Sequence, residues 1–240
     1  MGLTLRALAY LLLPMSHPEP NVAYSTLPPA DRYVGDHRRG EIELTGSDSG
    51  APSGAPVLFT NNYLTVLNDH VRFPDGRTGD YMRLFHPSEL LGRHGTVVVP
   101  TFEGDFFLIR LFRHPTRSWQ IEFPRGFAEP DLSPAENAGK ELAEELGVEA
   151  ASAIELGMVA PNTGLLATRA HVFHMELKSR PSFQLLLESQ VSEAIAGVIA
   201  IPRDGFLARL RSGRDPVLGG ITCGFTLSAM MLAVAREILT

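Results

Sequence analysis

The stretch GFAEPDLSPAENAGKELAEELGV, from Gly126 to Val148, is where several independent local signals predict the same structure. Ser133 followed by Pro134 and then by Glu136 has the form of a capping box with proline at the first helical position. Gly147 supplies the left-handed residue that commonly ends a helix. The stretch therefore predicts a loop and then a helix that begins at Pro134 and ends just before Gly147.

The predicted helix has an apolar stripe and an acidic patch. The stripe, which we expect to be buried, comprises Ala135, Ala138, Leu142 and Leu146. The patch consists of Glu141, Glu144 and Glu145, which are spaced so that all three share one side of the helix surface. Each like-charged pair costs roughly 0.2–0.5 kcal/mol, so the patch indicates a counter-charge. Magnesium suits it as a hard cation that accepts carboxylates, phosphate and water. The alternative is an ordinary solvated acidic face.

The same stretch resembles the signature of the Nudix hydrolases, in which glycine, glutamate and aliphatic residues stand at fixed spacing. Seven of its nine specified positions match, namely Gly126, Glu141, Leu142, Glu144, Glu145, Gly147 and Val148. Two positions depart, because Leu132 replaces a glutamate and Lys140 replaces an arginine. Lysine keeps the positive charge but lacks the planar fork of arginine. Glu129 and Asp131 lie near Leu132, although no spacing argument makes them substitutes. We expect an active enzyme whose activity these departures could reduce or shift.

The resemblance implies an α/β (α+β) fold: an α/β/α sandwich with a mixed sheet, preceded by a small N-terminal antiparallel strand region. Residues 1–56, rich in proline, glycine and serine, are expected to form an arm and a flexible linker. Residues 57–94 resemble the strands that contribute to a dimer in the ADP-ribose pyrophosphatase branch of the family. Residues 95–240 are expected to form the Nudix hydrolase domain.

Apolar alternation and continuous apolar runs predict the remaining elements. Strands are expected over residues 63–73, 81–85, 96–100, 106–112, 154–160, 171–177 and 195–201. Helices are expected over residues 204–211 and 222–239, the second of them buried. His171 and His174, three residues apart on one strand, point to opposite faces and are interpreted as structural rather than metal-binding.

Bulk composition narrows the class of protein. The net charge of −6 argues against a general nucleic-acid binder, which needs a basic stripe. The single cysteine, Cys223, excludes an intrachain disulfide and fits a reducing cytoplasm. The apolar run from Ala7 to Leu13 is too short to span a membrane, so we interpret residues 1–14 as an arm or as an over-extended start before Met15. We expect a cytoplasmic protein with no nucleic-acid or membrane partner.

Four residues around the signature are candidates for substrate binding. Arg110 and Arg113 carry fork-shaped donors that suit a diphosphate, with an ordinary exposed strand end as the alternative. Glu122 belongs to a Glu-x-Pro-x-Gly approach similar to that of the ADP-ribose pyrophosphatase branch. Gly164 and Pro161 are similar to residues of a loop that closes over the substrate in that branch.

The resemblance also implies roles for the acidic residues. Glu141 and Glu145 are expected to ligate the metal, with Glu144 as a further ligand or neighbouring partner. The main-chain carbonyl at Arg125 or Gly126 is expected to add a ligand. Glu141 and Glu144 are also candidates for catalysis.

The general base of this branch often lies on a later loop. Glu193 is the first candidate for this base and Glu188 is the second. For each of them the alternative is an ordinary loop carboxylate.

The activity that the resemblance implies is hydrolysis of the pyrophosphate bond of ADP-ribose or a related nucleotide sugar. The products would be a nucleoside monophosphate and a sugar phosphate, the cofactor would be Mg²⁺ with Mn²⁺ as a substitute, and the protein would be a homodimer. One alternative is a Nudix hydrolase for another dinucleotide or a nucleoside triphosphate. A second alternative is a catalytically weak sensor that binds ADP-ribose.

Overall fold

The computed structural model describes residues 21–46, 52–182, 195–213 and 219–238. The chain divides into two compact units, one ending at Met82 and the other beginning at Arg83. Within the described ranges, no helix is long and apolar enough to cross a membrane.

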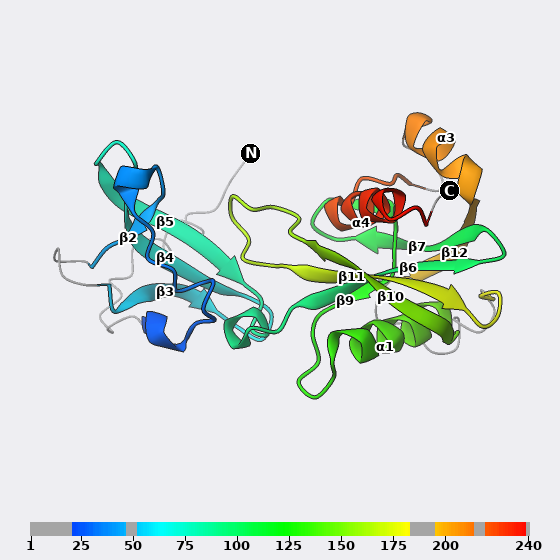
Figure 1. Cartoon of the computed structure of the whole chain (residues 1–240), viewed down its shortest axis with the longest axis horizontal. Coiled ribbons are helices and arrows are strands. Elements are labelled where there is room, and N and C mark those ends of the chain that lie inside the picture. The colour runs from blue at the N-terminus through cyan, green and yellow to red at the C-terminus, as the bar shows by residue number, and fades with distance from the viewer. Residues whose placement is uncertain (1–20, 47–51, 183–194, 214–218, 239–240) are drawn as a thin grey trace, which may run out of the picture. The chain divides into compact units, whose positions relative to one another are not determined.

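The N-terminal unit is built on a five-stranded antiparallel sheet (Figure 1). Its strands are β1 (Asn21–Ala23), β2 (Glu43–Leu44), β3 (Gly54–Thr60), β4 (Thr65–Arg72) and β5 (Thr78–Phe85). Strand β4 is central, because it pairs with β2, β3 and β5. Every second residue of β4 is buried, and the buried Asp69 carboxylate accepts a hydrogen bond of 2.8 Å from the Tyr24 hydroxyl.

The expected flexible linker over residues 1–56 is wrong for its described part. That part contains β1, β2 and the first residues of β3, together with short 3-10 turns at Tyr24–Thr26 and His37–Arg39. Four apolar residues scattered through it are buried, namely Tyr24, Leu27, Leu44 and Ala55. The average composition of the segment is that of a linker, but these few residues are enough to anchor it to the sheet.

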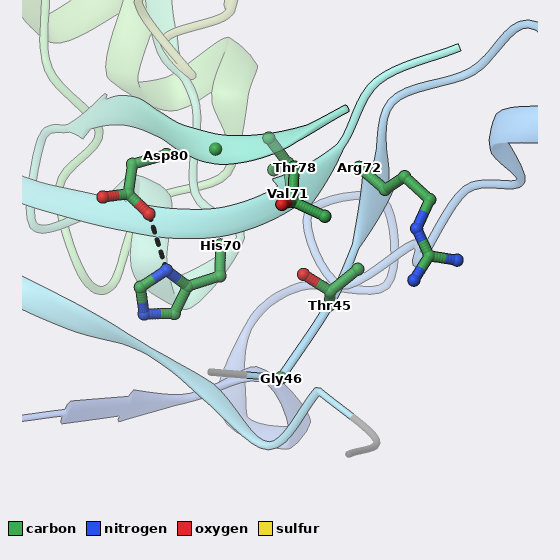
Figure 2. Close-up of a pocket in the computed structure, with 8 residues that line it drawn as sticks. Thr45, Gly46, His70, Val71, Arg72, Thr78 and Asp80 are labelled. Carbon is green, nitrogen blue, oxygen red and sulfur yellow. Dashed lines mark hydrogen bonds and ion pairs between the residues drawn. The ribbon is translucent and has the colours of Figure 1, made fainter. Parts of the chain in front are cut away.

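A polar hollow of about 280 Å³ lies in this unit beside β4 and β5. Figure 2 shows the His70 ring of β4 turned toward the Asp80 carboxylate of β5, with Nδ1 and Oδ1 2.6 Å apart. Both side chains are at least one-third exposed, so their ion pair adds little to stability.

The C-terminal unit is a three-layer sandwich around a seven-stranded mixed sheet. The strands are β6 (Gly95–Phe102), β7 (Asp105–Arg113), β8 (Ser118–Glu122), β9 (Arg125–Gly126), β10 (Ala150–Val159), β11 (Ala170–Leu177) and β12 (Ile195–Pro202). Their main order is β10-β11-β6-β7-β12, with β8 paired to β7 and β9 paired to β6. Strands β6 and β11 are parallel, and the other pairs are antiparallel. The predicted sandwich with a mixed sheet is confirmed, although β8 and β9 are not predicted.

Helices cover both faces of this sheet (Figure 1). Because successive side chains of a strand point to opposite faces, neighbouring residues of β6 belong to different cores. Val98 packs in the core under α1 (Pro134–Leu146) with Leu142. Val97 and Val99 pack in the core under α4 (Gly224–Ala235) with Met230.

Helix α1 has the predicted bounds. The Ser133 hydroxyl accepts from the Glu136 backbone N–H, and the Glu136 carboxylate accepts from the Ser133 backbone N–H. Gly147 ends the helix with a φ of 67°. The predicted buried stripe is wrong at Ala135, which is exposed, because the buried face is rotated to include Asn137.

The last two predicted helices are shorter than expected. A 3-10 turn at Arg203–Gly205 leads into α3 (Phe206–Arg211). Helix α4 begins two residues later than predicted, because Cys223 has an extended backbone and forms its N-terminal cap.

His174 of β11 is buried, as expected for a structural histidine. The Thr101 hydroxyl donates its only hydrogen to the Glu176 carboxylate at 2.6 Å, so it accepts from His174 Nε2 at 2.8 Å. The proton of the neutral ring is therefore on Nε2. The other ring nitrogen, Nδ1, is buried without a hydrogen-bond partner among the described residues. Burial lowers the pKa of His174 from its ordinary 6.5.

This lowered pKa predicts a loss of stability in mild acid. As the pH falls, the unfolded chain binds the proton before the folded chain does. His174 therefore leaves the free energy of unfolding unchanged above its unfolded pKa of 6.5 and lowers it as the pH falls below that value. We expect His174→Gln, which keeps a donor for Thr101 but does not titrate, to reduce the difference in free energy of unfolding between about pH 7.5 and pH 5.5. Urea denaturation at both values measures it, and an unchanged difference would show that His174 is not responsible.

Candidate active site

A cavity of about 390 Å³ in the C-terminal unit collects most of the charged residues of the signature stretch. It is bordered by the beginning of β6, by β9 and the loop after it, by one side of α1, by the residues before β11 and by the beginning of α4. Its charged lining residues are Arg113, Arg125, Glu129, Lys140, Glu141, Glu144 and Arg169. Cations and carboxylates therefore share one hollow of a size that suits a small ligand.

The Glu141 carboxylate packs directly against Gly126 in the cavity wall. A Cβ atom at position 126 would lie 2.1 Å from the Glu141 carboxylate carbon. Only glycine leaves room for this approach. The glycine of the signature thus serves to seat the Glu141 carboxylate against the β9 backbone.

The three glutamates of α1 have different surroundings. Glu141 and Glu145 are buried, whereas Glu144 is exposed. Glu145 does not line the cavity, and its carboxylate accepts the backbone N–H of Arg125 at 3.0 Å. The alternative of an ordinary solvated acidic face therefore does not hold, because α1 turns two of the three carboxylates toward β9.

Lys140 links two carboxylates at the cavity edge. Its ammonium lies 2.8 Å from Glu144 and 3.4 Å from Glu129. The hydrogen bond to Glu144 raises the pKa of Lys140. Leu132, which replaces a glutamate of the signature, is partly exposed and does not line the cavity, whereas Glu129 does.

A buried carboxylate orders the two arginines of the opposite wall. Glu122 accepts from Arg113 at 2.6 and 3.0 Å and from Arg125 at 3.1 Å. Burial alone would raise the pKa of Glu122, but the bonds from the two arginines outweigh it and hold the pKa below its ordinary value. Arg113 and Arg125 both line the cavity, so this network holds two guanidinium groups at its wall.

The other predicted substrate residues lie elsewhere. The Arg110 guanidinium stacks 3.8 Å from the centre of the Trp119 ring and does not line the cavity. Gly164 also lies outside the lining set, and its N–H donates to the Asn162 side chain within an exposed turn. The candidate base Glu193 and its alternative Glu188 lie outside the described residues.

Three residues that shape the cavity are not predicted from the sequence. Asn137 donates to Thr96 Oγ1 at 3.1 Å and to the Phe127 carbonyl at 3.0 Å, so it ties the loop after β9 to β6. Arg169 lines the cavity, and its backbone N–H donates to the buried Glu89. Phe225 lines the α4 side, with the Arg125 guanidinium 5.2 Å from its ring centre. All three positions depend on contacts between distant segments.

The signature glutamates do not form the tightest group of metal-ligand atoms. Among the described residues, that group is Asp36, His37 and Glu43 of the N-terminal unit, whose ligand atoms lie within 4.8 Å of one another. The Asp36 carboxylate also caps the turn at Arg38, and Glu43 bonds His37 and pairs with Arg72. These contacts account for the group without an ion.

Comparison with known proteins gives a domain match for part of the chain and a fold. Residues 92–194 match the family model described as the NUDIX domain. The chain is similar to a crystal structure described as an ADP compounds hydrolase, with 21% sequence identity and a TM-score of 0.59 over 77% of this chain and 91% of that one. At this identity the likeness establishes the fold alone. A search of curated proteins gives no match.

The contact between Glu141 and position 126 predicts the effect of two glycine substitutions. Gly126→Ala should lower the free energy of unfolding by about 1–3 kcal/mol, because its methyl group overlaps the Glu141 carboxylate. Gly139→Ala on α1 is the matched control, because it meets no atom within 4 Å and should raise stability by about 0.5–1 kcal/mol. Urea denaturation measures both.

Removal of Glu141 tests the cause. In a Glu141→Ala background, Gly126→Ala should lose most of its effect on the free energy of unfolding. A full effect in that background would contradict the steric explanation.

Proposed function

We propose that this chain, whose residues 92–194 match the NUDIX domain model, is a Nudix hydrolase that cleaves the pyrophosphate bond of ADP-ribose or a related nucleotide sugar. The products would be a nucleoside monophosphate and a sugar phosphate. The observation that carries the proposal is the cavity in which arginines and a lysine face the carboxylates of α1. A diphosphate needs the cations, and its hydrolysis needs carboxylates close to the same phosphorus atoms.

The name of the similar solved structure favours this substrate class. That protein is described as an ADP compounds hydrolase. A nucleoside diphosphate joined to a sugar belongs to the same class of compound, and the predicted ADP-ribose branch agrees with it.

The carboxylates of the cavity fit a divalent cation. Glu129, Glu141 and Glu144 line it, and such oxygen donors suit Mg²⁺, with Mn²⁺ as a substitute. In the proposal Glu141, Glu144 and the Arg125 carbonyl hold the cation from the cavity side, and Glu145, whose carboxylate accepts the Arg125 backbone N–H outside the lining, is the remaining ligand. The bound cation would supply concentrated positive charge against the phosphate oxygens.

Substrate binding and proton transfer are assigned to side chains of the chain itself. Arg113 and Arg125, ordered by Glu122, hold the diphosphate through paired N–H donors. Glu141 and Glu144 offer carboxylate oxygens on the cavity side that accept a proton from water as it attacks phosphorus. Glu193 remains the predicted general base.

The two departures from the signature are compatible with activity in this proposal. Lys140 keeps its contact with Glu144 as a point charge rather than as a fork. Glu129 brings a carboxylate to the cavity close to Lys140, although Leu132 does not.

Two further expectations belong to the proposal. The N-terminal strands would contribute to a homodimer, as in the branch that the sequence resembles. The proposed location is the cytoplasm, with which the single cysteine is compatible.

Release of AMP from ADP-ribose in the presence of Mg²⁺ tests the proposed activity. We expect turnover by the parent protein and a loss of at least about 10- to 100-fold in Glu141→Gln and Glu145→Gln, because each variant removes a charged oxygen from the cation site. Glu149→Gln is the matched control, since this exposed glutamate pairs with Lys178 and should leave the rate nearly unchanged. Binding of Mn²⁺, followed by its paramagnetic resonance signal, should weaken in the same two variants.

Other outcomes select the alternatives. Turnover of a different dinucleotide or of a nucleoside triphosphate, without ADP-ribose cleavage, would indicate another Nudix hydrolase. Binding of ADP-ribose without turnover of any nucleotide would indicate a sensor. Equal rates in Glu141→Gln, Glu145→Gln and the parent would contradict the assignment of the site.

A further inference from the structure

Phe127 is the most exposed aromatic side chain of the cavity. It follows the glycine of the signature directly, and the residue is 53% exposed although it lines the hollow. An aromatic ring left open to water inside a charged cavity gains free energy when a flat, apolar surface covers it. This exposure is the first sign of a ligand surface.

The ring of Phe127 is held in place from one side. It stacks on the imidazole of His86, with ring centres 3.7 Å apart and planes inclined by 5°. His86 is itself held, because its Nδ1 lies 2.8 Å from the Ser88 hydroxyl. Burial lowers the pKa of His86, so the ring is neutral at neutral pH and stacks without a charge. One face of Phe127 is therefore covered and supported.

The backbone of Phe127 is fixed as well. Its carbonyl accepts from Asn137 Nδ2, and the same nitrogen donates to Thr96 on β6. A ring with a fixed backbone and one stacked face loses little freedom when a ligand covers the other face.

The other aromatic residue of the cavity is less available. Phe225 is only partly exposed, and the Arg125 guanidinium lies over its ring. The adjacent Thr226 is fully buried and bonds the Phe123 backbone, which anchors Phe225 in the wall. Between the two rings, Phe127 offers the larger open surface.

We propose that Phe127, backed by His86, is the platform on which the nucleobase of the substrate stacks. The inference rests on the proposed function, since it assigns the base of the same nucleoside diphosphate that Arg113 and Arg125 grip in this cavity. Stacking on an aromatic face accepts every base, because each base has a π face. Phe127 thus selects nucleotides over sugar phosphates and pyrophosphates that lack a base.

Product binding measures this selection without turnover. Isothermal titration calorimetry measures the affinities of the full chain for AMP and for ribose 5-phosphate, both with Mg²⁺. The ratio of the two affinities isolates the contribution of the nucleobase to binding. We expect the parent to prefer AMP. Phe127→Leu should reduce the ratio about 5- to 100-fold, the range for losing one base–aromatic stack, and Phe127→Trp should keep it.

Two further variants locate the effect. Phe112→Leu removes an aromatic ring that packs on Trp119 away from the cavity, and it should leave the ratio unchanged. If Phe225→Leu rather than Phe127→Leu abolishes the preference, the base lies on the other wall and the inference is wrong. A parent that binds AMP and ribose 5-phosphate equally would also overturn it.

The inference and the proposed activity fail separately. AMP release that depends on Glu141 but not on Phe127, with an unchanged affinity ratio in Phe127→Leu, would overturn the inference alone. Absence of hydrolysis together with a Phe127-dependent preference for AMP would overturn the activity and leave the platform in place.

Discussion

The seating of the Glu141 carboxylate against the Gly126 backbone is the constraint on which the cavity depends. It requires α1 to pass close over β9 at a point where a single methyl group would block it. The hydrogen bond from the Arg125 backbone to Glu145 reinforces the same contact one helical turn later. Together these contacts fix the position of the acidic side of the helix relative to the sheet. Burying two carboxylates in this way costs stability, so their placement fits a role in binding rather than in packing.

Opposite charges are distributed around the cavity so that each group has a local partner. Glu122 orders the two arginines of one wall, and Lys140 joins Glu129 to Glu144 at the edge. The net charge of the chain therefore says little about the ligand. An acidic protein can hold an anionic diphosphate because the relevant field is that of a few cations in a small hollow.

Distant segments of the C-terminal unit are tied to the cavity by polar side chains. Asn137 connects the loop after β9 to β6, and the buried Glu89 of the short turn Glu89–Leu91 accepts from both His94 and the Arg169 backbone. These ties keep loop residues such as Phe127 and Arg169 at the cavity without the regular hydrogen bonding of a strand or helix. Pre-organised loops of this kind lower the entropy lost on ligand binding.

The sequence by itself determined α1, because the capping box, Pro134 and the glycine stop are interactions between residues a few positions apart. It also determined the strands with strongly apolar runs, such as β6 and β7. It predicted Gly126 and Glu141 through the signature, and Arg113 from the strand before it, and all three line the cavity. Only the tertiary structure decided that Glu145 lies behind the cavity, that Arg110 stacks on Trp119, and that residues 21–46 join a sheet. The physical reason is the separation in sequence of the interacting residues. Helix caps and apolar periodicity depend on residues a few positions apart, whereas the direction of a side chain depends on which distant backbone it packs against.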